Sequence, residues 1–306
     1  MRAVAGAPVA GAPVTGSSGA GRWIWALSGL VTAVVIAIPI ARAITTAGDP
    51  APEVVYAQPA PASVRTIVVT QPVTSVTVLS YGAPVQVATG SVSHVQVTET
   101  AGAMSVKGQG ASPVPVTQTW SGGHLLLADP ACSPAGMRDC AVTFALTVPP
   151  GVAVTAVTDG GPITVSGVAG ANLDSGGGLV SATKIDGPLT VRTEGGALLI
   201  DGLTGALNAD TGNAPLIAQG VDAATATVST DGGNARIIFT APPDSATVST
   251  DGGTAFLTVP GGPYALTADS DGGPEMVRIA TNPAATRSLT VTTAGAPLRI
   301  APASKG

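Results

Sequence analysis

The stretch from Ala246 to Pro260 reads Ala-Thr-Val-Ser-Thr-Asp-Gly-Gly-Thr-Ala-Phe-Leu-Thr-Val-Pro. One repeat earlier, Ala226 to Phe239 reads Ala-Thr-Val-Ser-Thr-Asp-Gly-Gly-Asn-Ala-Arg-Ile-Ile-Phe. Thr, Val and Ser alternate before the Asp-Gly pair, which is typical of a strand with one buried face. Asp-Gly favours a tight turn because Gly adopts positive φ freely and Asp tolerates it. Each stretch therefore predicts a strand, a corner and a second short strand.

The Thr-Asp-Gly-Gly tetrapeptide, with close variants, recurs along the second half of the chain. The repeats start at Thr158, Ser175, Thr193, Thr211, Thr230, Thr250, Ser270 and Thr293. Successive starts are 17 to 23 residues apart. A period near 20 residues is typical of solenoids, in which no single coil can bury its apolar face alone. The sequence therefore predicts an all-β fold, a β-solenoid of about eight 17–23-residue coils, with no helix after Ala47.

The amino-acid composition limits the kinds of binding partner that are expected. Of 306 residues, 45% are hydrophobic and 10% are charged, and the net charge is −5. Nucleic acid is an unfavoured partner, because Lys and Arg are scattered singly and form no visible basic patch. Aromatic residues make up only 3% of the chain, which weighs against a platform for stacking sugars.

The N-terminal part of the sequence predicts that the rest of the chain is exported from the cytoplasm. Nineteen residues between Arg22 and Arg42 carry no charge, and as a helix they would span about 28 Å, close to the thickness of a bilayer core. We expect a transmembrane helix at 23–43 behind a disordered cytoplasmic segment at 1–22, because Arg2 and Arg22 favour the inner side. A cleaved signal peptide is the alternative, since Ala41-Arg-Ala43 fits an A-x-A site. A Pro-rich linker follows at 44–62.

The exported part is predicted to be one domain over 63–306. Its first strands, up to Pro150, show no clean repeat, and we expect irregular first coils and a cap, with a separate small sandwich as the alternative. Cys132 and Cys140 are the two cysteines. In an exported protein, their spacing predicts a small disulfide loop.

The residues from Cys140 to Gly167 resemble the bacterial putative-adhesin family, a β-strand-repeat domain of unknown function in the cell envelope. The resemblance rests on the Thr-Val-Pro-Pro-Gly step at Thr147 to Gly151, which leads into Gly-Gly turn repeats. It extends over roughly residues 63–300. It implies a fold and an adhesin label, and it supplies no catalytic residues.

The acidic turn residues are the one group that invites a chemical hypothesis. They are Asp159, Glu194, Asp231, Asp251 and Asp271. We expect Asp231, Asp251 and Asp271 on successive coils, about 4.8 Å apart. Stacked carboxylates could hold Ca²⁺, but Asp-Gly is also simply a good corner, and the second interpretation is favoured. No metal or other cofactor is predicted.

We therefore expect a non-catalytic cell-envelope protein that acts in adhesion or scaffolding. It would be anchored in the cell membrane by a single pass, with its C-terminal domain outside, and its partner would be a surface protein or a glycan. A membrane-tethered envelope-stress or regulatory component is the second hypothesis. A polysaccharide-active enzyme is the third, disfavoured because each candidate carboxylate lies at a turn.

Overall fold

The computed structural model describes residues 63–101, 103–104, 112–113, 116–129 and 142–303. Every described residue lies in one compact unit. Within the described ranges, no helix has the length and apolar character needed to cross a membrane. The predicted membrane helix at 23–43, the linker at 44–62, and Cys132 and Cys140 lie outside the described residues.

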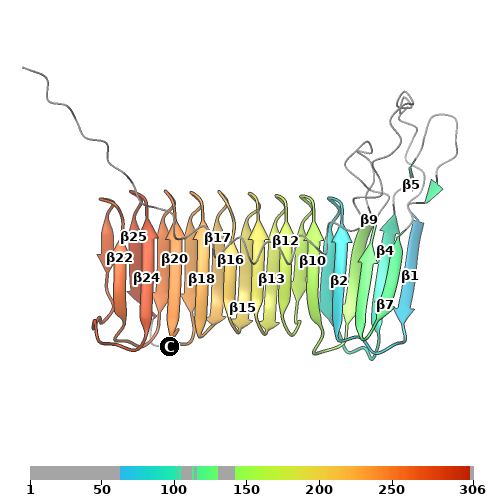
Figure 1. The fold of residues 1–306 in the computed structure, drawn as a ribbon, viewed down its shortest axis with the longest axis horizontal. Helices are drawn as coiled ribbons and strands as arrows, with labels where there is room; N and C mark the ends of the chain where they lie inside the picture. Colours follow the sequence, from blue (N-terminus) through green and yellow to red (C-terminus); the bar gives the residue numbers. More distant parts are fainter. Residues whose placement is uncertain (1–62, 102, 105–111, 114–115, 130–141, 304–306) are drawn as a thin grey trace, which may run out of the picture. The chain divides into compact units, whose positions relative to one another are not determined.

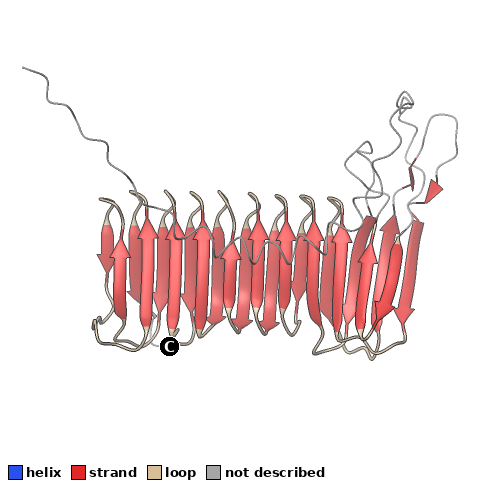
Figure 2. Cartoon of the chain, viewed as in Figure 1, coloured by secondary structure: helices blue, strands red, loops and turns tan. Residues whose placement is uncertain are grey.

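The described residues form an all-β fold with two large sheets of mostly parallel strands (Figures 1 and 2). The first sheet has 12 strands, in the order β1 (Ser63–Val69), β4 (Val95–Ala101), β9 (Val142–Val148), β3 (Val85–Thr89), β11 (Ile163–Ser166), β13 (Val180–Asp186), β15 (Leu198–Thr204), β17 (Leu216–Asp222), β19 (Ala235–Phe239), β21 (Ala255–Val259), β25 (Leu298–Pro302) and β23 (Glu275–Val277). The second sheet has 11 strands, in the order β22 (Ala265–Asp269), β24 (Ser288–Thr293), β20 (Ser245–Thr250), β18 (Thr225–Thr230), β16 (Leu207–Asp210), β14 (Leu189–Thr193), β12 (Ala171–Ser175), β10 (Ala153–Thr158), β2 (Ser75–Ser80), β8 (His124–Ala128) and β7 (Thr117–Ser121). The short strands β5 (Ala103–Met104) and β6 (Ser112–Pro113) pair with each other.

From Ala153 to Val259 the strands alternate between the two sheets. We use the term strand pair for a strand of the second sheet, the corner after it, and the next strand of the first sheet. Each strand from β10 to β19 pairs in parallel with the strand two places further along the chain, as β18 does with β20 from Thr225 opposite Ser245 to Thr230 opposite Thr250. The predicted Asp-Gly-Gly corners lie between the two strands of each strand pair.

The core lies between the two sheets and follows the period of two in the sequence. In β20, Ala246, Val248 and Thr250 are buried, and the residues between them face outward. Most buried positions carry Val, Leu, Ile or Ala, at roughly 1.5–3 kcal/mol for each of the larger side chains. Because a strand pair contributes only a few of these, it depends on its neighbours for stability.

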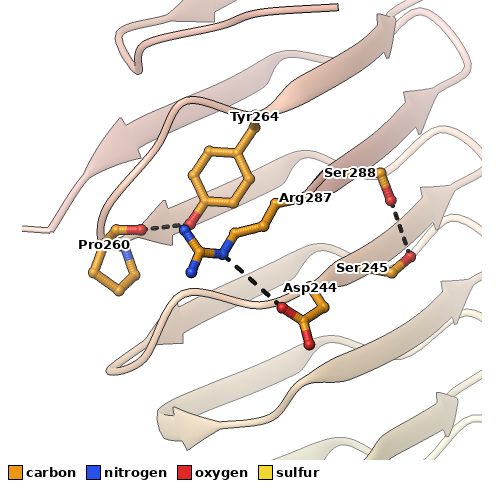
Figure 3. Close-up of polar contacts among 6 residues, drawn as sticks. All are labelled: Asp244, Ser245, Pro260, Tyr264, Arg287 and Ser288. Carbon is orange, nitrogen blue, oxygen red and sulfur yellow. Dashed lines mark hydrogen bonds and ion pairs between the residues drawn. The ribbon is translucent and has the colours of Figure 1, made fainter. Parts of the chain in front are cut away.

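The last two strand pairs are stacked out of chain order. The β24–β25 pair lies beside β20–β21, and β22–β23 lies outside it. Polar contacts at this junction fix β24 next to β20: Ser288 Oγ donates to Ser245 Oγ at 3.2 Å, and Arg287 Nε lies 3.9 Å from Asp244 Oδ1 (Figure 3). In the connection, Tyr264 is buried and its hydroxyl donates to the Pro260 carbonyl.

Burial explains this order. Leu289 and Val291 of β24 are fully buried, whereas Leu266 and Ala268 at the matching positions of β22 are only half-buried. A terminal strand pair has one neighbour, so its inward side chains are less covered, and the more apolar pair stabilises the fold more in the inner place. The long step of 23 residues between Ser270 and Thr293 is where the chain makes this crossing.

Apart from β5 and β6, the strands before Val152 belong to the same two sheets. β2 and β3 pair in parallel with β10 and β11, and β8 and β9 pair on the other side of β2 and β3. The outermost strands β1, β4 and β7 run antiparallel to their neighbours.

Candidate binding surface

The acidic turn residues are all exposed. Asp159, Glu194, Asp231, Asp251 and Asp271 each follow a buried hydroxyl residue at a corner. Among the residues that the structure describes, no group of three or more His, Cys, Asp or Glu could hold a metal ion.

The expected row of three aspartates on successive coils is wrong at one position. Thr230 lies opposite Thr250, so Asp231 and Asp251 occupy neighbouring corners. Thr250, however, lies opposite Thr293, and Asp269 of β22 lies opposite Thr292 on the far side. The corner at Ala294 therefore separates Asp251 from Asp271, because the β24–β25 pair takes the inner place.

The hydroxyl residue that opens each tetrapeptide has the structural role. These residues, the buried hydroxyl ladder, are in stack order Ser80, Thr158, Ser175, Thr193, Thr211, Thr230, Thr250, Thr293 and Ser270. Each donates its side-chain hydroxyl to the carbonyl three residues later; Thr158 Oγ1 donates to Gly161 O at 2.7 Å and Thr193 Oγ1 to Gly196 O at 2.6 Å. The ladder thus satisfies a buried carbonyl at each corner.

The two glycines of the motif are required for different physical reasons. Gly252 has a φ of +107°, a conformation that favours glycine. A Cβ added at Gly253 would lie 1.9 Å from the carbonyl oxygen of Gly233 in the neighbouring corner, so close stacking excludes any side chain there. The second residue of the motif varies most, being Asp, Glu, Gly or Ala in different repeats, whereas the third is Gly except at Asn213 and the fourth is Gly except at Ala214 and Ala296.

Two carboxyls are buried near the N-terminal end of the sheets. Asp129 follows β8, next to Ser80, and accepts hydrogen bonds from Tyr81 N at 3.3 Å and Ser80 Oγ at 3.5 Å. Burial raises the pKa of Asp129 from 3.8 to about 6. Burial also raises the pKa of Glu99, and Arg65, its cross-strand partner, opposes that shift. Neither carboxyl is presented on the outer face of a sheet.

The outer face of the second sheet is mostly polar. From β2 to β22 its central row contains only Thr and Asn, and on β8 the row continues with Leu126; the Thr and Asn residues are, in order, Thr77, Thr155, Asn172, Thr190, Asn208, Thr227, Thr247, Thr290 and Thr267. Thr is β-branched and suits a half-exposed strand. In the next row, Arg192 lies between Asp174 and Asp210 on the neighbouring strands, so its charge is compensated.

The outer face of the first sheet is different, because apolar side chains and arginines share one row. This row, the outer stripe, consists in stack order of Leu199, Ile217, Arg236, Phe256, Arg299 and Met276. The exposed fractions of its four apolar members are 39% at Leu199, 43% at Ile217, 41% at Phe256 and 43% at Met276. Leu199 and Ile217 are neighbours, whereas Arg236 and Arg299 separate the other two; exposed apolar clusters are typical of interaction surfaces.

Three arginines converge on this face without an acidic neighbour in register. Arg236 and Arg299 flank Phe256, and Arg278 lies beside Arg299, since its backbone N–H donates to Ile300 O. Across the described part of the chain the one ion pair is Arg287 with Asp244, which lies elsewhere. Arginines that are scattered singly in the sequence are thus brought onto nearby strands of the sheet.

The outer stripe has a sequence signal that a search for motifs misses. Every member is the sixth residue after a hydroxyl of the ladder, as Arg236 is after Thr230 and Phe256 after Thr250. An alignment of the repeats on that hydroxyl yields the whole row. It would place Met276 next to Phe256, however, whereas the inner position of β25 places Arg299 there.

Comparison with known proteins finds similar solved structures. A putative adhesin from Bacteroides fragilis NCTC 9343 is 10% identical, with 79% of this chain and 97% of that chain covered, at a TM-score of 0.39. A putative adhesin from Parabacteroides merdae ATCC 43184 is 11% identical, with 78% and 95% covered, at 0.41. A putative lipid binding protein from Parabacteroides distasonis ATCC 8503 is 10% identical, with 78% and 96% covered, at 0.44. No protein-family model and no curated protein matches the chain. The solved structures to which the chain is similar thus include proteins named as adhesins, as the resemblance at residues 140–167 predicts.

Proposed function

We propose that this chain is a non-catalytic protein of the cell envelope that binds a surface partner through the outer stripe, in adhesion or scaffolding. The proposed architecture is a β-solenoid. It is supported by the alternation of strands between two sheets and by their parallel pairing with the strand two places on.

The observation that carries the proposal is the contrast between the two outer faces. One face has a row of Thr and Asn beside a row in which Arg192 lies between two aspartates, and the other combines exposed Leu, Ile, Phe and Met with three arginines that have no acidic neighbour in register. Solvation alone explains the first face. Apolar side chains with uncompensated arginines are instead enriched where a surface meets a partner.

The proposed topology places this surface outside the cell. A single-pass anchor at 23–43 would keep residues 1–22 in the cytoplasm, and the linker at 44–62 would hold the sheets away from the membrane. A disulfide between Cys132 and Cys140 belongs to the same proposal, because it requires an oxidising compartment.

An adherence assay tests the function. Cells that express the full chain should adhere to immobilised bacteria more than cells that lack it, and Phe256→Ala combined with Arg299→Ala should abolish the difference. Thr247→Ala, on the opposite face, is the matched control and should leave adherence unchanged. Equal adherence by the stripe variant and the wild type would contradict the proposal.

A further inference from the structure

We propose that the outer stripe binds a linear acidic polysaccharide whose carboxylates belong to uronic acids. This inference rests on the proposed function and specifies the chemistry of its partner. Three features of the stripe support it: its dimensions, its charge and the place of its one aromatic ring.

The stripe is narrow and long. It is one residue wide and crosses six neighbouring strands, β15, β17, β19, β21, β25 and β23, in register. At about 4.8 Å per strand, its length is roughly 24 Å. The rows beside it are mixed in character, with Asp201, Gln219, Ile238 and Thr258 on one side and Pro215 and Asn234 on the other. An extended polymer fits this shape better than a membrane, which needs a broad apolar face.

The charge of the stripe selects an anion. Arg236 and Arg299 are two strands apart, so their Cα atoms are separated by roughly 10 Å, and Arg278 adds a third positive charge next to Arg299. Guanidinium groups bind carboxylates and phosphates through two parallel hydrogen bonds. Arg192 on the opposite face differs, because two aspartates flank its charge, whereas Arg236 and Arg299 have no acidic neighbour in register.

The position of Phe256 favours a uronate over other anions. Its exposed ring lies between Arg236 and Arg299 and offers an apolar surface for the C–H face of a sugar ring. A uronic acid carries its carboxylate directly on that ring, so one ligand can contact the phenyl group and a neighbouring guanidinium together. A polyol phosphate has no ring face. Single-stranded nucleic acid stacks successive bases on several aromatic rings, and Phe256 is the only one in the stripe.

The test measures binding of the purified full chain to immobilised polygalacturonate by biolayer interferometry. Three comparison probes are fully methyl-esterified polygalacturonate, polyphosphate and an oligothymidylate. The expected result is binding to polygalacturonate that weakens with added salt, and no binding to the neutral ester. Polyphosphate and the oligothymidylate should bind at least tenfold more weakly.

Variants assign the binding to the stripe. Phe256→Ala and Arg299→Gln should each weaken polygalacturonate binding at least tenfold, and Arg299→Lys should restore only part of the loss because it lacks the planar fork. Arg192→Gln, which removes the same charge from the opposite face, should bind as the wild type does. Far-UV circular dichroism verifies that each variant is folded.

Three results would overturn the inference: no binding to polygalacturonate, equal binding to the neutral ester, or equal losses in Arg192→Gln and Arg299→Gln. Tighter binding to polyphosphate or oligothymidylate would overturn it as well. If polygalacturonate fails while adherence of cells still depends on Phe256 and Arg299, only the class of partner is wrong. If adherence is also unchanged in the stripe variants, the proposed function fails with it.

Discussion

Thr250→Val removes one hydroxyl from the middle of the buried hydroxyl ladder and keeps the shape of the side chain. Thr250 is fully buried and donates its hydroxyl to the carbonyl of Gly253. After the substitution, that carbonyl loses its side-chain donor, and a methyl group occupies the place of the hydroxyl. The change therefore isolates the hydrogen bond from packing.

The magnitude follows from the two opposing terms. A buried polar group left without its partner costs about 1–3 kcal/mol. The methyl group that Val adds is buried, and its burial stabilises the folded state by roughly 0.8 kcal/mol. We therefore expect a net loss of about 0.2–2.2 kcal/mol in the free energy of unfolding.

Urea denaturation of the wild type and the variant measures the difference, with the midpoint as the readout and the slope as a check that the unfolded state is unchanged. Thr247→Val is the matched control on the same strand, because Thr247 is exposed on the outer face. It should change stability by less than about 0.5 kcal/mol. Equal effects of the two substitutions, or a Thr250→Val protein as stable as the wild type, would refute the role assigned to the ladder.

Two other substitutions test the corners and the end of the ladder. Gly253→Ala should destabilise by about 1–3 kcal/mol or more, because its Cβ would meet the Gly233 carbonyl at 1.9 Å; an unchanged urea midpoint would contradict this. Asp129→Asn should remove a pH dependence of the free energy of unfolding. Since burial raises the pKa of Asp129 from 3.8 to about 6, the wild type loses stability as the pH rises through this interval, by up to about 3 kcal/mol. The Asn variant should be the more stable protein at pH 7, and a wild type with the same stability as the variant at pH 4 and pH 7 would contradict the assignment.

Much of the architecture could be predicted from the repeats. The period-two alternation in Ala246–Pro260 and the Asp-Gly-Gly corners predict short strands joined by tight turns, and the structure contains them at β20 and β21. These features are local, so backbone preferences and side-chain patterning are sufficient to specify them.

The order of the last strands could not be predicted in this way. It depends on the relative apolar burial of β22 and β24, which is a competition between two distant segments for one place. The composition of the outer stripe could not be predicted for the same reason, because Arg299 lies beside Phe256 only when β25 is next to β21. Sequence reasoning singles out the Asp of the motif because it is charged. The Thr or Ser before it has the structural role, but its hydroxyl is buried in the core and carries no charge that would draw attention to it.

Hydrogen exchange measured by mass spectrometry tests the central claim, that β24–β25 lies between β20–β21 and β22–β23. A strand paired on both sides exchanges its amides more slowly than an edge strand. The amides of Ser288–Thr293 should therefore exchange much more slowly than those of Ala265–Asp269. If Ala265–Asp269 is instead the better protected segment, the strand pairs stack in chain order, Met276 replaces Arg299 beside Phe256, and the account of the outer stripe is wrong.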